Sequence, residues 1–291
     1  MLRSVTNLPR LPNRAKDSHK GTFGKVLIIA GSVGMSGAAV LAGLGALRGG
    51  TGLVQIACPH AIQPIVAAGN PCYLTNGLTH DSSGQLTTSS LETLTSLLPT
   101  VKAVAFGPGM GRSPDVVQAL HHLITQYEGP IIIDADGLHA YQQLHQQGMI
   151  PDRKVPLTCT PHPGEFAHLT GLTTALVQAD RKQQAVRFVM EHKVLLVLKG
   201  QGTLVTDGQR MYVNNTGNSG MAKGGSGDVL TGLIASLAAQ GMPPLEAAQA
   251  GVYLHGLAGD LAAASLSEQA MLPTDLVEAL PAAFRKYNPA S

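Results

Sequence analysis

The chain has 291 residues, of which 44% are hydrophobic and only 13% charged. This composition excludes an intrinsically disordered protein and allows one large α/β domain or two ordinary ones. The net charge of +2 predicts no nucleic-acid partner and no membrane partner, and residues 1–20 contain no hydrophobic signal core, so we expect a cytoplasmic protein.

Short apolar runs rich in Val and Ile recur along the chain, and each ends in a turn that contains Gly or Asp. They predict strands separated by helices. Because the runs are continuous rather than alternating, we expect a mostly parallel sheet covered on both faces by helices. The predicted strands are 26–30, 53–57, 103–106, 131–134, 157–160 and 194–198, and the predicted helices are 38–48, 226–240, 244–264 and 273–286.

No composition shift marks a domain boundary. The Thr- and Ser-rich stretch 79–96 is the best loop candidate, but apolar residues resume on both sides of it. We therefore predict a single domain over residues 1–291, with 1–20 as an N-terminal extension. The three cysteines, Cys58, Cys72 and Cys159, are too widely spaced for a disulfide framework or a metal site, so we expect them to be reduced and structural.

Five turns lie at the predicted carboxyl ends of strands, where an open parallel sheet binds its ligands. One such turn alone is weak evidence, since glycine is the ordinary solution to a tight corner, but five together indicate a site. The turns are 31–37, 107–111, 134–137, 161–165 and 199–203.

A sixth turn, Gly224–Asp228, leads into the predicted helix 226–240. Its glycines leave backbone N–H groups unshielded at a helix start, which is a site for phosphate. Asp228 falls in the first helical turn. It either complements the helix dipole or takes a proton from a hydroxyl that attacks the phosphate, and its place beside an anion site favours the second role. The chain has neither a Walker A pattern nor a Gly-x-Gly-x-x-Gly after the first strand.

The six turns resemble, in order and composition, those of ADP/ATP-dependent NAD(P)H-hydrate dehydratases, from about residue 20 to 280. The matching motifs are Gly31-Ser-x-Gly-Met-Ser-Gly-Ala-Ala39, Gly107-Pro-Gly-Met-Gly111, Asp134-Ala-Asp-Gly137, Thr160-Pro-His-Pro-Gly-Glu-Phe166, Lys199-Gly-x-Gly-Thr203 and Gly217-Asn-x-Gly-Met-Ala-x-Gly-Gly-Ser-Gly-Asp-Val-Leu-Thr-Gly232. The resemblance implies a ribokinase-like fold, a three-layer α/β/α sandwich. It also implies a hydro-lyase that repairs hydrated nicotinamide cofactors.

The implied reaction transfers phosphate from ADP, or from ATP, to the C6 hydroxyl of the S-epimer of NADHX or NADPHX. Loss of that phosphate then restores NADH or NADPH, with Mg²⁺ screening the nucleotide. Asp228 would be the catalytic base. The implied substrate-binding residues are Ala39, Gly109, His162 and Asp228, and the nucleotide-binding residues are Lys199, Gly200, Gln201, Gly202, Thr203, Gly225 and Gly227.

Four side chains near these turns have a structural alternative. His162 either contacts a ligand or is an exposed loop residue, and Glu165 fits a helix cap slightly better than a support for a metal-bound water. Asp136 is as well suited to a helix N-cap as to Mg²⁺. Lys199 reaches either a phosphate or a neighbouring carboxylate, and its place at a strand end favours phosphate.

The chain departs from the family pattern at two positions: Ser219 stands where proline is common, and Lys223 where a small residue is common. Lys223 would add a cation beside the phosphate turn and so tighten nucleotide binding or change the preference between ADP and ATP. Many bacterial relatives carry an epimerase domain at the N-terminus; with some 20 residues before the first predicted strand, we expect that activity on another chain. The resemblance also implies a homotetramer, and the Ala-rich helix 247–264 suits either an interface or the core.

Two other functions share the glycine-rich turn. A vitamin-precursor kinase of the same fold would carry it with its aspartate, and only the His-Pro-Gly-Glu turn and segment 31–39 distinguish the two enzymes. An adenylate-binding sensor would bind nucleotide without turnover, which the position of Asp228 disfavours.

Overall fold

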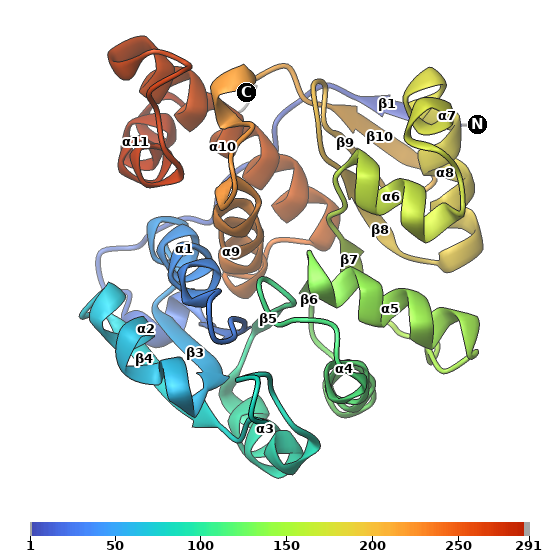
Figure 1. Ribbon diagram of the computed structural model, residues 1–291. Helices are drawn as coiled ribbons and strands as arrows, with labels where there is room; N and C mark the ends of the chain where they lie inside the picture. Colours follow the sequence, from blue (N-terminus) through green and yellow to red (C-terminus); the bar gives the residue numbers. More distant parts are fainter. Residues whose placement is uncertain (1, 288–291) are drawn as a thin grey trace.

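The computed structural model describes residues 2–287, and the strands in this part of the chain form one sheet (Figure 1). Every neighbouring pair is parallel except the two pairs that include β9. In sheet order the strands are β1 (Arg3–Val5), β10 (Arg210–Val213), β9 (Leu204–Thr206), β8 (Leu195–Leu198), β7 (Thr158–Cys159), β6 (Ile131–Ile133), β5 (Ala103–Phe106), β2 (Lys25–Ile29), β3 (Leu53–Pro59) and β4 (Tyr73–Leu78).

The six predicted strands are confirmed to within two residues at each end, and they form the centre of the sheet. Four strands at its two sides were not predicted. The signal for β4 is weak because Thr75 and Asn76 interrupt its apolar character, and β9 and β10 form a short hairpin around Asp207 and Gly208. Residues 1–20 were predicted only as an N-terminal extension, but they also contain β1, which pairs with β10 at the edge of the sheet.

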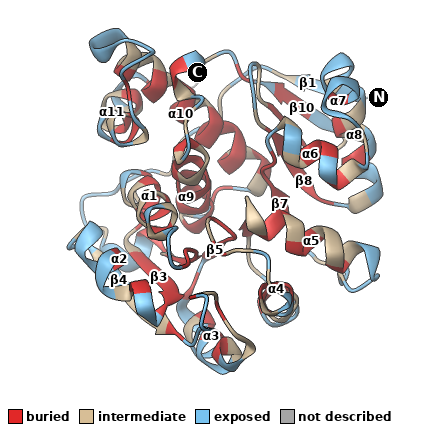
Figure 2. Cartoon of the chain, viewed as in Figure 1, coloured by how far each residue is buried: buried red, intermediate tan, exposed pale blue. Residues whose placement is uncertain are grey.

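Two helical layers cover the sheet, which confirms the predicted three-layer α/β/α sandwich. Alternate residues of one strand face opposite layers: Val26 and Ile28 belong to one apolar cluster, and Leu27 and Ile29 to the other. Figure 1 shows the two layers, and Figure 2 shows the buried residues along the strands and the inner helix faces.

The first layer contains α1 (Ser36–Arg48), α2 (Gln63–Gly69), α9 (Ser226–Ala239), α10 (Pro244–Leu266) and α11 (Pro273–Lys286). The second contains α3 (Leu91–Leu97), α4 (Pro114–Gln126), α5 (Asp136–Gln146), α6 (Pro163–Thr170), α7 (Thr174–Ala179) and α8 (Arg181–His192).

The packing bears on three sequence-based interpretations. The stretch 79–96 is a loop only in its first part, because α3 occupies its end. Helix α10 contributes much of one face to the core, which favours the core interpretation of this Ala-rich helix. All three cysteines are free, with Cys58 and Cys159 buried and Cys72 exposed. No helix among the described residues is long and apolar enough to cross a membrane.

Helices α1 and α9 approach each other more closely than ordinary side chains allow. A Cβ atom on Gly45 would lie 2.2 Å from the carbonyl oxygen of Val229, and one on Gly232 would lie 1.8 Å from that of Ala42. The missing side chains let the two backbones touch, so α9 is held against α1 and its N-terminus is fixed over the carboxyl edge of the sheet.

Candidate active site

The predicted turns meet at one edge of the sheet. β8, β7, β6, β5 and β2 are consecutive parallel neighbours, so the turns that follow them lie side by side. The turns after β2 and β5 are joined directly: Gly31 donates its N–H to the carbonyl oxygen of Pro108 at 2.8 Å, and the Ser32 hydroxyl donates to that of Gly109 at 2.8 Å. A Cβ on Gly109 would meet the side chain of Ala38 at 2.9 Å, so Gly109 and the first turn of α1, where Ala39 lies, are brought together as expected.

The glycine-rich turn leads into α9 as predicted, and the helix begins at Ser226. Gly225 is the N-cap residue with φ of 100°, a conformation that glycine adopts without strain, and no side chain caps the helix. Among the backbone hydrogen bonds of residues 2–287, none uses the N–H of Gly224, Gly225 or Gly227. These donors are available to an anion at the positive end of the helix dipole.

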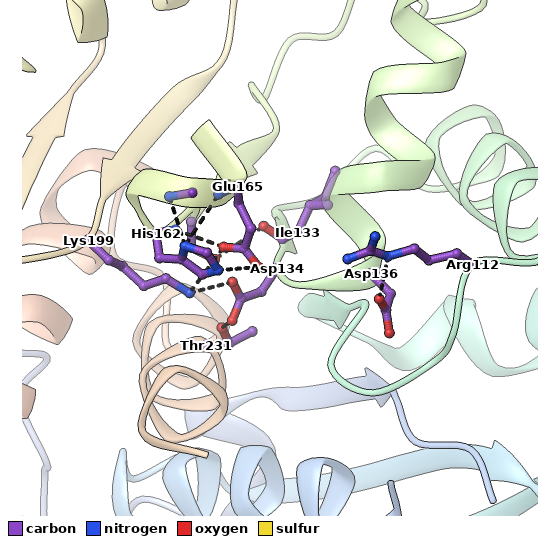
Figure 3. Close-up of polar contacts among 10 residues, drawn as sticks. Arg112, Ile133, Asp134, Asp136, His162, Glu165, Lys199 and Thr231 are labelled. Atoms are coloured by element: carbon purple, nitrogen blue, oxygen red, sulfur yellow. Dashed lines mark hydrogen bonds and ion pairs between the residues drawn. The ribbon is translucent and has the colours of Figure 1, made fainter. Parts of the chain in front are cut away.

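A buried polar network lies directly beneath this turn (Figure 3). Asp134, 1% exposed, accepts hydrogen bonds from Lys199 Nζ at 2.8 Å and from the Thr231 hydroxyl at 2.7 Å. A Cβ on Gly227 would lie 3.1 Å from that Lys199 nitrogen, so the ammonium group sits against the start of α9. Lys199 therefore binds a neighbouring carboxylate, which was the second of its two predicted roles. It also lies at the phosphate turn.

The net effect of burial and nearby charges is to raise the pKa of two groups beside α9. Burial and the neighbouring Asp134 carboxylate raise the pKa of Asp228 to about 7, against a partial lowering by Lys199. Burial alone would lower the pKa of Lys199, but Asp134 and Glu165 outweigh it and raise that pKa. Asp228 thus gains or loses its proton near neutral pH, which is what a general base requires.

The turn before α6 is closed by its own side chains (Figure 3). His162 Nδ1 accepts the N–H groups of Gly164 and Glu165 at 3.0 and 3.3 Å, and the Glu165 carboxylate accepts the His162 N–H at 2.8 Å. The helix-cap interpretation of Glu165 is therefore confirmed. Its other neighbours are His162 Nε2 at 3.6 Å and Lys199 Nζ at 3.9 Å, which places both turns in one site.

Asp136 is not the N-cap of α5, which was one of its two predicted roles. The N-cap of α5 is Ala135, with φ of 50°, and Asp136 is the first helical residue. Its carboxylate accepts the Gly111 N–H at 2.9 Å and pairs with Arg112 at 3.1 Å (Figure 3). The N-cap interpretation was wrong because the carboxylate turns toward the neighbouring glycine turn, which it ties to α5.

Sequence reasoning missed the residues that shape the two segments predicted to bind the nucleotide. Arg181, at the start of α8, donates to the carbonyl oxygens of Leu198, Lys199 and Gln201 and so sets the path of segment 199–203. His255 in α10 is buried, and its Nε2 lies 2.9 Å from the carbonyl oxygen of Ser226. Burial lowers the pKa of His255 to about 4, so it holds the first turn of α9 as a neutral ring. Neither residue stands near a glycine-rich motif in sequence, so no local signal pointed to them.

Lys223 does not direct its charge toward the phosphate turn. Its ammonium group donates to the carbonyl oxygens of Gln269 and Met271, between α10 and α11. Ser219 is tied to the same loop through Glu268. The two positions that depart from the family pattern therefore anchor segment 219–223 to the 267–272 loop.

The site combines an open helix start, a base with a pKa of about 7 and buried charges within a ribokinase-like α/β/α sandwich. Such features are typical of enzymes that place a carboxylate beside the phosphates of a nucleotide. The NAD(P)H-hydrate dehydratase family matches residues 26–282, and the chain belongs to that family.

Individual relatives support the same assignment. The chain is similar to the ADP-dependent (S)-NAD(P)H-hydrate dehydratase of Bacillus subtilis, with 35% identity over 96% of this chain and 95% of the relative. The bifunctional NAD(P)H-hydrate repair enzyme of Moorella thermoacetica is 42% identical over 96% of this chain, which spans 52% of that relative. The chain thus spans about half the length of such bifunctional relatives. The crystal structure of the ADP/ATP-dependent dehydratase from Bacillus subtilis, co-crystallised with ATP and Mg²⁺, superposes with a TM-score of 0.82, at 33% identity and with 95% and 94% of the two chains covered.

Proposed function

We propose that this chain is an ADP-dependent (S)-NAD(P)H-hydrate dehydratase, a hydro-lyase that converts NADHX and NADPHX back to NADH and NADPH and releases AMP and phosphate. The observation that carries the proposal is Asp228: it lies in the first turn of α9, beside open backbone donors, with its pKa raised to about 7. Family membership supplies the substrate class.

The chemistry needs a better leaving group than hydroxide. Asp228 removes the proton of the C6 hydroxyl as its oxygen attacks the terminal phosphorus of ADP, and the bond from that phosphorus to AMP breaks. The N–H groups of Gly225 and Gly227 stabilise the charge on the transferred group. The ring nitrogen's lone pair then expels phosphate from C6, and the neighbouring carbon loses a proton to complete the dehydration.

The remaining site residues have parallel assignments. Segment 199–203 binds the nucleotide, with its carbonyl groups held in place by Arg181. Ala39, Gly109 and His162 line the pocket for the hydrated ring. ATP is a possible second donor, since the related Bacillus subtilis enzyme was co-crystallised with it.

Mg²⁺ supplies charge screening for the nucleotide phosphates when it is bound. The site offers the oxygen ligands that this ion prefers, but both Asp134 oxygens already accept hydrogen bonds, and Glu165 accepts the His162 N–H. Glu165 would therefore hold the ion through water, with the nucleotide providing the direct ligands.

Three wider assignments belong to the same proposal. We place the enzyme in the cytoplasm, as a homotetramer, with a separate epimerase that interconverts the two epimers of the hydrate.

An absorbance assay tests the function. The protein is mixed with enzymatically prepared NADHX, ADP and Mg²⁺, and we expect the NADH absorption band to rise while AMP and phosphate accumulate in equal amounts. If neither ADP nor ATP produces NADH, the dehydratase assignment is wrong. Phosphorylation of a vitamin-precursor alcohol by the same sample would instead identify a kinase, and nucleotide binding without any turnover would identify a sensor.

A further inference from the structure

Three potential metal ligands meet on the second helical layer, where α5 and α8 end. His145 lies in the last turn of α5, and Glu191 and His192 are the last two residues of α8. Each offers one ligand atom, and the three atoms all lie within 4.8 Å of one another. The two imidazole rings stack with their centroids 3.8 Å apart.

This cluster is separate from the candidate active site. α5 starts directly after β6 at the site and runs away from it for 11 residues, which corresponds to about 16 Å. α8 ends two residues before β8 begins, so His192 lies beside the amino end of that strand. The cluster therefore lies at the sheet edge opposite the glycine-rich turns, on the helices labelled α5 and α8 in Figure 1.

The surroundings of His192 fit a metal-bound imidazole. The hydroxyl of Tyr141, a fully buried residue, lies 3.0 Å from His192 Nδ1. With the proton on Nδ1 donated to that hydroxyl, the Nε2 lone pair is free for an ion. Such a second hydrogen bond is the usual support of a histidine ligand, because it fixes the ring and its tautomer. The Phe188 ring stacks on His192, with the centroids 4.0 Å apart, and helps to hold this orientation.

The local electrostatics also favour a cation. Two helices present their carboxyl ends here, and each carries the negative end of its dipole. Glu191 is exposed, and it takes part in none of the ion pairs formed within residues 2–287. The adjacent Lys193 is turned away from it and pairs with Asp152 at 3.0 Å.

We propose that His145, Glu191 and His192 bind one Zn²⁺ ion that links the end of α5 to the end of α8. Two imidazole nitrogens and one carboxylate oxygen suit zinc better than magnesium or calcium, which prefer oxygen ligands alone. A tetrahedral zinc site places its ligand atoms about 3.4 Å apart. The three ligand atoms already lie within 4.8 Å of one another, so side-chain adjustment alone has to bring them to that spacing. Water fills the fourth position.

The ion would act on stability and not on the chemical step. It joins the helix that follows the Asp134 strand to the helix that precedes the Lys199 strand. Those two strands carry the buried ion pair beneath the glycine-rich turn. An ion at the far ends of α5 and α8 would therefore connect the two strand–helix units that position the Asp134–Lys199 pair. It would lie at a distance from the reacting groups.

Titration of the chelator-treated full-length chain with ZnCl₂ tests the proposal, with calorimetry for stoichiometry and thermal unfolding as a second readout. We expect one equivalent to bind and the Tm to rise by about 3 °C or more at saturation. CoCl₂ in place of zinc should give the visible absorption of a tetrahedral cobalt site.

Variants then locate the ion. His145→Gln and Glu191→Gln change partly or fully accessible side chains and should fold normally, and each should weaken Zn²⁺ binding at least about tenfold. Tyr141→Phe should weaken it about tenfold by removing the support of His192. His139→Gln, a change in the same helix outside the cluster, is the matched control and should bind as the unchanged protein does.

Two results would overturn this assignment. One is the absence of saturable Zn²⁺ binding to the unchanged chain. The other is binding that His145→Gln and Glu191→Gln leave intact, because the ion would then occupy another place, such as the carboxylates of the candidate active site.

Discussion

Helices α6 and α9 begin at the same edge of the sheet with the same local plan, glycine at the second helical position and an acid at the third, yet their turns differ in one respect. In α6, His162 and Glu165 satisfy each other's backbone donors. In α9 a glycine occupies the N-cap, no side chain caps the helix, and Asp228 stands beside free N–H groups. One helix start is complete within the protein, and the other needs a ligand to be complete.

The two acids at equivalent positions therefore have different surroundings. Glu165 caps its own turn, while burial, together with the neighbouring Asp134 carboxylate, raises the pKa of Asp228 to about 7. A carboxylate that is costly to ionise and faces an anion site does not stabilise the fold, which favours a chemical role for it.

Neutralising the two acids should give the largest difference between the turns. Asp228→Asn removes the base and should lower the rate of NADH formation by about 10² to 10⁴-fold, with nucleotide binding still measurable by calorimetry. Glu165→Gln is the matched control. The glutamine Oε1 still accepts the His162 N–H and can still accept a hydrogen bond from a water on Mg²⁺, so the rate should fall less than about tenfold. Equal losses in both variants would contradict the division of tasks.

The pH dependence of the reaction should follow Asp228 in the same way. Because the base must be ionised, the rate should rise about tenfold per pH unit below pH 7 and level off above it. The stability effect has the opposite direction. The folded state holds this proton up to about pH 7, while an unfolded aspartate releases it near pH 4, so ionised Asp228 destabilises the fold as pH rises between these values.

Thermal unfolding of Asp228→Asn checks that sign. The variant should gain more Tm relative to the unchanged protein at pH 8 than at pH 4. A gain that does not depend on pH would show that the raised pKa is not a property of Asp228 in the folded state.

The sequence was sufficient for the centre of the fold and for the α9 turn, because both rest on local signals. Continuous Val- and Ile-rich runs predicted the central strands, and three glycines before Asp228 predicted the helix start. The position of Lys199 at the site was also predictable, since it directly follows a strand.

What the sequence could not supply are contacts between distant segments. Lys199 meets Asp134 across 65 residues, and His255 meets Ser226 across 29. The direction of a long side chain is also a tertiary property, so Lys223 was expected at the phosphate turn but binds the 267–272 loop. The edge strand β1 depends on its pairing with the distant strand β10, which neither segment indicates alone.

Removing the side-chain cap of α6 by mutation should lower the free energy of unfolding moderately. His162→Ala removes the acceptor for two backbone N–H groups and should lower the free energy of unfolding by about 1 kcal/mol, measured in urea. His162→Asn restores a capping side chain and should recover most of that loss.

Kinetics of the Asn variant then isolate the proposed substrate contact. A raised KM with normal stability would support a role of the His162 ring in binding the hydrate, and an unchanged KM would limit this residue to its cap.

The smallest effect is expected at Lys223, although its sequence position is nearest to the open turn. Its ammonium group donates to two backbone carbonyl oxygens of the 267–272 loop, so it is not directed toward a phosphate at the α9 turn. Lys223→Met keeps the length of the side chain and should change the Kd for ADP by less than about threefold, the range that screened or distant charges produce. Lys199→Met is the informative contrast, because that ammonium group lies against the first turn of α9 and its loss should weaken ADP binding far more. If Lys223→Met instead weakens ADP binding at least as much as Lys199→Met, the Lys223 side chain must leave the loop when nucleotide binds. The nucleotide alone would then not complete the α9 turn.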